Sequence, residues 1–147
     1  MPSTRYVVPY KICNYLLFQK AVGFSKAAII RAAEAAALRH LLIDEMETYP
    51  NRPVILIGDL NDVVHSVSTE IISGTKPWKR LPAAEKKVIW DTLLHSVTEI
   101  QVRNSDRDVY FSTIHNGRYQ VLDHIFVSQH FCQGYAQRLG KVQFVQF

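Results

Sequence analysis

The sequence predicts an α/β fold, because short runs of β-branched and apolar residues alternate with segments whose apolar residues recur at helical spacing. The clearest apolar run is Pro53–Ile57, and the clearest helical segment lies between Ser25 and Pro50. Asn116-Gly117 is the favoured composition for a tight two-residue turn and indicates a hairpin. With 147 residues, 48% hydrophobic and 20% charged, we expect a single globular domain over residues 1–147.

The first part of the chain predicts a strand followed by a long helix. Tyr6–Phe18 has the composition of a strand, interrupted at Pro9 because proline lacks the amide proton that a central strand needs. Ser25 is a plausible N-cap of the helix, and Pro50 ends it. Apolar side chains at helical spacing should let this helix lie flat on a sheet, contributing packing and no catalytic group: Ile30, Ala33, Ala37, Leu38, Leu41 and Leu42.

The remaining elements follow in alternation. Pro53–Ile57 predicts a buried strand that Gly58 ends abruptly. After a polar stretch over residues 65–74, a helical pattern runs from about Ala83 to Leu94, with a proline before it where a helix start tolerates one. Tyr110–Ile114 and Tyr119–Val127 then predict an antiparallel hairpin that presents Asp123.

The segment Gly58-Asp59-Leu60-Asn61-Asp62 is the strongest candidate for a site. It follows a predicted strand, where open α/β folds keep their functional groups, and it offers an anionic oxygen and a neutral amide that together could hold a water and a phosphate. An ordinary turn explains the same residue types equally well. Haloacid-dehalogenase-like phosphatases carry a similar element, but theirs has one more residue and needs an upstream aspartate nucleophile. Here the only upstream aspartate, Asp44, lies deep in the helical pattern.

Strand alternation assigns Asp123 and His124 to opposite faces. Asp123 falls on a face with Val121, Ile125 and Val127, where an unpaired carboxylate is costly, so it should have a partner. His124 falls on the other face, where we expect a structural, hydrogen-bonded histidine. The other five histidines have no metal-ligand spacing, so the metal ligands stay unassigned.

Three segments in order resemble the endonuclease/exonuclease/phosphatase superfamily, which includes pancreatic-type deoxyribonucleases. They are the helix Arg31–Arg39, the run Pro53–Asn61 and the segment Tyr119–Ser128. The resemblance implies a four-layered α/β sandwich with a mixed, mostly antiparallel sheet and flanking helices. Because that sandwich needs roughly twice the modal single-domain length, we expect this chain to form about half of it, the C-terminal half.

Departures from the superfamily pattern bear on activity. No early asparagine or metal-binding glutamate precedes the first helix, no Ser-Asp-His element occurs, and Tyr15 stands where relatives often have a histidine. A sandwich cut in half also leaves one apolar sheet face uncovered, which predicts self-association.

The chemistry that the resemblance implies is metal-dependent phosphoester hydrolysis. Asp59 would orient or deprotonate the attacking water, Asn61 would bind the phosphate oxygen, and Asp123 would orient a histidine base. Magnesium, with manganese as the alternative, fits hard carboxylate ligands. Without the histidine and the glutamate we expect a weakly active or inactive chain. The competing hypothesis is a non-catalytic binding module or remnant.

Charge and cysteine usage indicate partners and compartment. A net charge of +4 and a pI near 9.1 favour a polyanionic substrate such as nucleic acid, without excluding a small phosphodiester. Trp78, within Lys76–Arg80, could stack on a base, and Arg118 could bind phosphate, although a solvated loop with an aromatic packed against it is the more ordinary explanation of both. Cys13 and Cys132 lack metal-ligand spacing and indicate buried thiols. With no signal pattern and no membrane-spanning run, we expect a cytoplasmic protein, unless a preceding segment carries a targeting signal.

Overall fold

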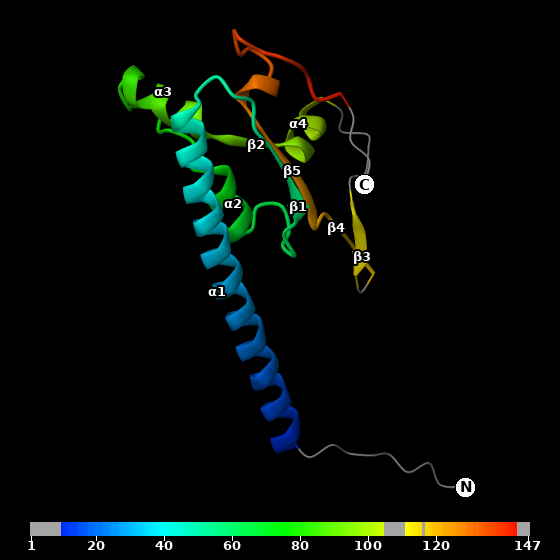
Figure 1. Ribbon diagram of the computed structural model, residues 1–147. Coiled ribbons are helices and arrows are strands. Elements are labelled where there is room, and N and C mark those ends of the chain that lie inside the picture. The colour runs from blue at the N-terminus through cyan, green and yellow to red at the C-terminus, as the bar shows by residue number, and fades with distance from the viewer. Residues whose placement is uncertain (1–9, 105–110, 116, 144–147) are drawn as a thin grey trace, which may run out of the picture.

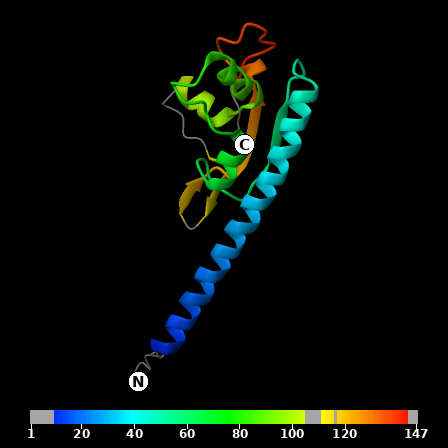
Figure 2. The same cartoon turned by 90° about the vertical axis from the view of Figure 1, so that its left-hand side faces the viewer.

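The computed structural model describes residues 10–104, 111–115 and 117–143. One long helix, α1 (Tyr10–Thr48), lies along the side of a smaller body through its C-terminal half, and its N-terminal half projects beyond that body (Figures 1 and 2). No helix in these ranges is both long and apolar enough to cross a membrane. The body contains the remaining elements: β1 (Ile55–Asp59), α2 (Val67–Ser73), α3 (Ala83–Thr92), β2 (Leu94–Ser96), α4 (Val97–Asn104), β3 (Thr113–His115), β4 (Arg118–Gln120), β5 (Asp123–Ser128) and a 3-10 turn, η1 (Gln129–Phe131).

The predicted strand over Tyr6–Phe18 is wrong from Tyr10 onward, because these residues begin α1; residues 6–9 lie outside the described ranges. No proline interrupts the chain between Tyr10 and Thr48, and each residue added to a helix gains a hydrogen bond without a new nucleation step. Ser25 is correspondingly not an N-cap. It lies inside α1, and its hydroxyl donates a hydrogen bond to the carbonyl of Ala21 (3.0 Å).

The main sheet has three strands in the order β1-β5-β2, with both pairings antiparallel. The prediction that Gly58 ends the first strand is wrong, because β1 continues through Gly58 to Asp59. Gly58 pairs in register with His124, and nothing lies within 4 Å of where its Cβ would be. The strand ends one residue later, where Leu60 N–H donates to the carbonyl of Leu122 (3.0 Å).

The hydrophobic core lies between α1, α2 and one face of this sheet. Its centre is made of Ala35, Met46, Ile72, Leu94 and Phe126, all buried. The prediction that α1 packs flat is confirmed for one side of the helix, where Leu38 and Leu42 contact this cluster. It is wrong for Ile30 and Leu41, which are 57% and 65% exposed.

Helices α2 and α3 and the short strand β2 follow β1 along the chain. α3 confirms the helical pattern from Ala83, but it ends at Thr92, and Leu94 instead begins β2. The stretch expected to be only polar contains α2, whose N-cap Ser66 accepts a hydrogen bond from Thr69 N–H (3.3 Å). α2 then packs against α1 and β2.

The hairpin around Gly117 is confirmed, with β3 and β4 paired from Thr113↔Gln120 to His115↔Arg118; Tyr110 and Asn116 lie outside the described ranges. The continuous strand Tyr119–Val127 is wrong, since β4 ends at Gln120 and a separate strand, β5, begins at Asp123. Ser112 Oγ accepts hydrogen bonds from the backbone amides of Leu122 (3.0 Å) and Asp123 (3.2 Å), where the chain passes from β4 to β5.

A single guanidinium joins three helices. Arg39 of α1 donates hydrogen bonds to the carbonyls of Ile72 (3.3 Å) and Thr92 (2.7 Å), near the C-terminal ends of α2 and α3. Burial lowers the pKa of Arg39. Gly74 leaves room for it, because a Cβ there would lie 2.5 Å from Arg39 Nη2 and its φ of +84° disfavours other residues.

Replacing Arg39 should therefore destabilise the fold. Arg39→Met keeps a long apolar stem but leaves two part-buried carbonyls without their charged donor, and we expect a loss of about 2 kcal/mol in the free energy of unfolding. Urea denaturation measures the loss. Lys20→Met, an exposed change on the projecting part of the same helix, is the matched control and should shift stability by less than about 0.5 kcal/mol. Equal stabilities for the two variants would contradict a stabilising role for the hydrogen bonds of Arg39.

Candidate functional site

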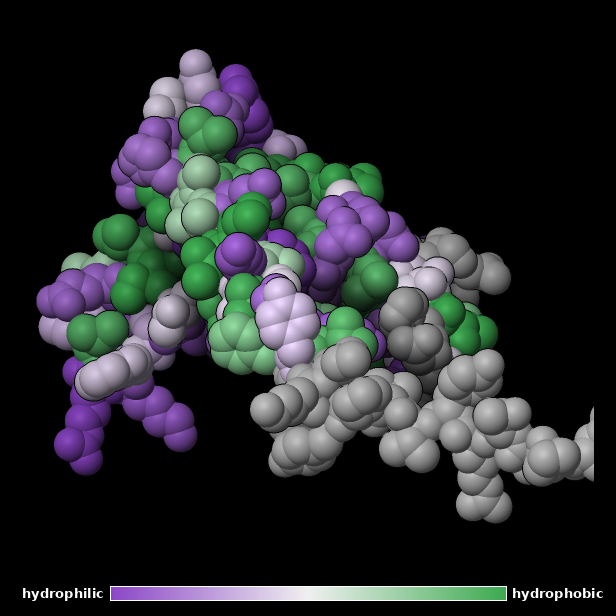
Figure 3. Space-filling view, turned by 90° about the horizontal axis from the view of Figure 1, so that it is seen from below, coloured by the Kyte–Doolittle hydropathy of each residue, from purple (hydrophilic) through white to green (hydrophobic). Residues whose placement is uncertain are grey.

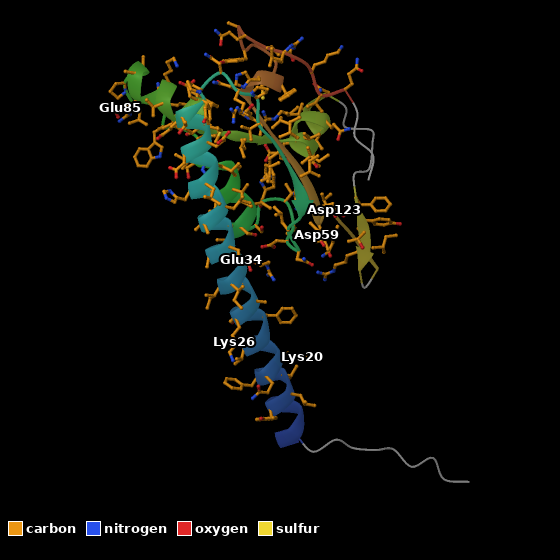
Figure 4. All side chains as sticks on the ribbon, in the orientation of Figure 1. Lys20, Lys26, Glu34, Asp59, Glu85 and Asp123 are labelled. Atoms are coloured by element: carbon orange, nitrogen blue, oxygen red, sulfur yellow. The ribbon has the colours of Figure 1, made fainter. Side chains whose placement is uncertain are left out.

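Asp59 and Asp123 are register partners at one end of the main sheet. β1 pairs with β5 so that Asp59, the last residue of β1, lies opposite Asp123, the first residue of β5. Register partners in antiparallel strands have Cα atoms about 4.5–5.5 Å apart and side chains on the same face. Figure 4 shows both aspartates at the same end of the sheet. The pairing brings together two segments that lie far apart in the sequence.

A tight turn follows Asp59. Asp59 Oδ1 accepts a hydrogen bond from the backbone N–H of Asn61 (2.8 Å), and Asn61 has a φ of +50°. Asparagine tolerates this left-handed conformation better than most residues. The ordinary turn that the sequence left open is thus present. Both side chains are nevertheless exposed, so the same turn also presents them to solvent.

Asp62 anchors this turn to two other parts of the chain. Its Oδ2 accepts a hydrogen bond from Ser68 Oγ (2.6 Å) and lies 3.4 Å from Arg31 Nε, and its Oδ1 accepts one from Val63 N–H (3.0 Å). Desolvation alone would raise the pKa of Asp62. The hydrogen bonds from Ser68, Ser66 and Val63 and the charge of Arg31 outweigh it, so the pKa is lowered overall.

His124 holds the same turn from the sheet. It is 2% exposed, and its Nε2 donates a hydrogen bond to the backbone carbonyl of Asp62 (2.8 Å). The prediction of a buried, hydrogen-bonded histidine on the face opposite Asp123 is confirmed. Asp123 itself is half-buried, and its carboxylate has no hydrogen bond or ion pair with any residue in the described part of the chain. The partner expected for Asp123 is thus not found there.

Asp59 and Asn61 also line a hollow of about 170 Å³ between α1 and the start of α2. The polar residues that α1 contributes to it are Arg31 and Glu34, and Figure 4 shows Glu34 on the stretch of α1 nearest the two aspartates. Besides its packing, α1 thus contributes an ion pair to this region, between Arg31 and Asp62. Sequence spacing held no signal for this contact, because a helix and a loop far apart in sequence form it.

A second hollow, of about 360 Å³, lies beside α2 and β2 and is lined by His65, His95 and His124 among others. Burial lowers the pKa of His95, with the charges of Lys76 and Arg103 contributing in the same direction. This hollow contains neither Asp59, Asn61 nor Asp123. We place the candidate site at the aspartate end of the sheet, because two carboxylates and an exposed amide lie together there.

The other predicted substrate-binding residues lie on different elements. Trp78 is 77% exposed in the connection between α2 and α3, and Arg118 is exposed at the start of β4. Neither lines the hollow that contains Asp59 and Asn61. Arg103 pairs with Glu99 (3.5 Å), and Arg107 lies outside the described ranges. Substrate binding by Trp78 and Arg118 stays a prediction.

The carboxylate and amide oxygens at this end of the sheet could supply part of the coordination of a hard divalent cation. Within the described ranges, no group of three or more histidine, cysteine, aspartate or glutamate side chains is placed to hold a metal. Magnesium, however, is commonly held by one or two carboxylates together with water and substrate phosphate. Like charges directly opposite one another on neighbouring strands are also destabilising, and a cation between Asp59 and Asp123 would relieve that repulsion.

Comparison with known proteins gives one match. The sequence model described as the Endonuclease/Exonuclease/phosphatase family matches residues 3–143. No curated protein and no solved structure matches the chain.

The anchoring of Asp62 predicts a specific pH dependence. Because its folded pKa is lowered below the usual 3.8, its ionised form stabilises the fold above that pH, and this contribution is lost as the pH falls through the folded value. Asp62→Asn should therefore be less stable than the wild type in urea at pH 7, and the difference should shrink below about pH 3.8. Glu85→Gln, an exposed change on α3, is the control and should show no such trend. A difference for Asp62→Asn that is as large at pH 3 as at pH 7 would contradict the charge argument.

Proposed function

Because the chain belongs to the endonuclease/exonuclease/phosphatase family, we propose that its aspartate end is the site of a metal-assisted phosphodiester hydrolysis. The family supports a phosphoester-hydrolase function. The observation that carries the more specific proposal is the register pairing of Asp59 with Asp123, beside the turn that exposes Asn61. These groups supply a base, a counter-charge for a cation and a hydrogen-bond donor.

Asp59 is proposed to act on the water. Its Oδ1 accepts a hydrogen bond from the amide of Asn61, which leaves Oδ2 to accept a hydrogen bond from an attacking water and to orient or deprotonate it. The hydrogen bond also fixes the orientation of the carboxylate, so that less rotational freedom is lost in the transition state. The anchors at Asp62 support this role by holding the turn from α1, α2 and β5.

Asn61 is proposed to bind the phosphate. A neutral amide donor stabilises the negative charge that develops on a phosphate oxygen in the transition state. Because the amide carries no positive charge, it does not compete with the phosphate for the attacking water. Its exposed position one turn beyond the sheet suits a substrate that approaches from solvent.

Asp123 is proposed to share the cation and to orient a histidine base. Asp59, Asn61 and Asp123 would hold the magnesium ion, which supplies neutralisation of the phosphate charge. Within the described ranges no histidine forms a hydrogen bond or ion pair with Asp123. The histidine that Asp123 would orient is therefore proposed and not observed. We also propose that the chain by itself has low activity.

The proposed substrate class is a nucleic acid, supported by the net charge of +4. A small phosphodiester has the same reacting group without the repeated charges. Varying the salt concentration distinguishes the two substrate classes, because binding to a polyanion weakens steeply as the salt concentration rises.

The activity test compares the wild type with Asp59→Asn in cleavage of plasmid DNA and of a chromogenic bis-phosphoester with magnesium. We expect weak, magnesium-dependent cleavage by the wild type and a loss of about 100-fold in Asp59→Asn, as for removal of a general base. Glu85→Gln, on a helix remote from the aspartates (Figure 4), should match the wild type. Equal rates for the wild type and Asp59→Asn would remove Asp59 from the mechanism.

The sheet face that carries the two aspartates is also apolar and open. Ile55 and Ile57, on the same face as Asp59, are 53% and 70% exposed. Seen from below, hydrophobic residues are interspersed with hydrophilic ones on the surface of the described residues (Figure 3). We propose that this face drives self-association beside the site, since patches of this kind are rarely left in contact with water.

Reducing the apolar area of this face should weaken the association. In Ile57→Thr the sheet retains a β-branched residue while apolar surface is lost, so we expect a lower apparent mass at a given concentration in sedimentation velocity. Val88→Thr, a change to the same residue at an exposed position of α3, is the control. An unchanged mass in Ile57→Thr would exclude this face as the main contact.

A further inference from the structure

The long helix α1 has a second apolar face that the body does not cover. The body lies against the side of α1 that carries Ala35, Leu38, Leu42 and Met46. On the opposite side, a row of exposed residues recurs every three or four positions, the spacing at which side chains line up along one side of a helix. We name this row the outer stripe: Lys26, Ile30, Ala33, Ala37, Leu41 and Asp44.

The middle of the outer stripe has the composition of a helix-packing surface. Ile30 and Leu41 are 57% and 65% exposed, although they belong to the apolar repeat that predicted burial. Ala33 and Ala37 lie between them, and such small side chains let a second helix approach closely while Ile30 and Leu41 fill the space on either side. A helix that is apolar on two sides is usually buried on both.

The ends of the outer stripe carry opposite charges. Lys26 lies at the N-terminal end and forms no ion pair with any residue in the described part of the chain. Asp44 lies at the other end, with its side chain 61% exposed, and its contact with His40 (3.8 Å) is an ion pair only when the imidazole is protonated. The two residues are equally distant in sequence from position 35.

This symmetry decides the partner. A second copy of α1 packed antiparallel, with a twofold axis opposite position 35, brings Lys26 of each copy to Asp44 of the other and Ala33 to Ala37. A parallel pair would instead place Lys26 beside Lys26 and Asp44 beside Asp44, which is repulsive. A self-complementary surface of this kind is what a twofold dimer requires.

We propose that the outer stripe binds the outer stripe of a second copy of this chain, forming an antiparallel helix pair. The arrangement leaves room for both bodies, because each lies on the side of its own α1 away from the contact (Figure 2). It uses neither the sheet face nor Asp59, Asn61 or Asp123, so it is independent of the proposed function.

A charge substitution in the middle of the stripe tests the contact. Every variant is made in the Ile57→Thr background, so that the sheet face contributes less to association. Sedimentation equilibrium of the full chain should then give a dimer in the micromolar range without a further change and a monomer with Ala37→Glu. The exposed alanine can be replaced without disturbing the fold, but in the helix pair the new charge would be buried. Ala28→Glu is the matched control. It is an exposed alanine two turns before Ala35, on the face away from the contact, and it should leave the dimer intact.

A charge exchange tests the antiparallel direction. Lys26→Glu and Asp44→Lys should each weaken the dimer by roughly ten-fold, and the double variant Lys26→Glu/Asp44→Lys should restore it, because each copy again offers unlike charges to the other. Circular dichroism confirms that every variant retains its helix.

Three results would overturn the proposal. They are a wild type that is monomeric at all concentrations, a dimer that persists in Ala37→Glu, and a double variant no tighter than the single ones. Ile57→Thr separates this contact from the sheet face. If that change alone produced the monomer, the association would belong to the sheet and not to α1.

Discussion

The antiparallel pairing of β1 with β5 is the constraint on which the rest of the structure depends. Its register places Leu56 beside Phe126 on the covered face and Asp59 beside Asp123 on the open face. A shift by one residue would exchange the two faces, exposing Phe126 and burying the aspartates. The cost of burying two unpaired carboxylates makes such a shift unfavourable, so the polar site and the apolar core specify the same register.

The turn beyond β1 is held by contacts with three other elements. Asp62 accepts a hydrogen bond from Ser68 of α2 and pairs with Arg31 of α1, while His124 of β5 donates to its carbonyl. None of these groups touches the reacting atoms in the proposed chemistry. They position the backbone that carries Asp59 and Asn61, because moving a loop bound on three sides would break several of these contacts.

Two errors in the sequence interpretation have different physical origins. Tyr10–Phe18 is an apolar run too short to distinguish strand from helix by periodicity, and it joined the helix because the chain beyond it offered an uninterrupted continuation. Tyr119–Val127 alternates like a single strand, but Ser112 binds the backbone at Leu122 and Asp123 and divides it between two sheets. The first error therefore reflects helix propagation along the chain, and the second reflects a contact between segments that outweighed a local pattern.

The sequence by itself determined the α/β class, the helix that ends before Pro50, the turn at Gly117 and the family, since local composition and motif order encode these features. It also indicated Asp59, Asn61 and Asp123 as candidates. Only the tertiary structure decided that Asp59 and Asp123 face one another, that Arg31 reaches Asp62, and that one side of α1 stays open. These features depend on strand register and helix rotation, which are set by the packing of segments far apart in the chain.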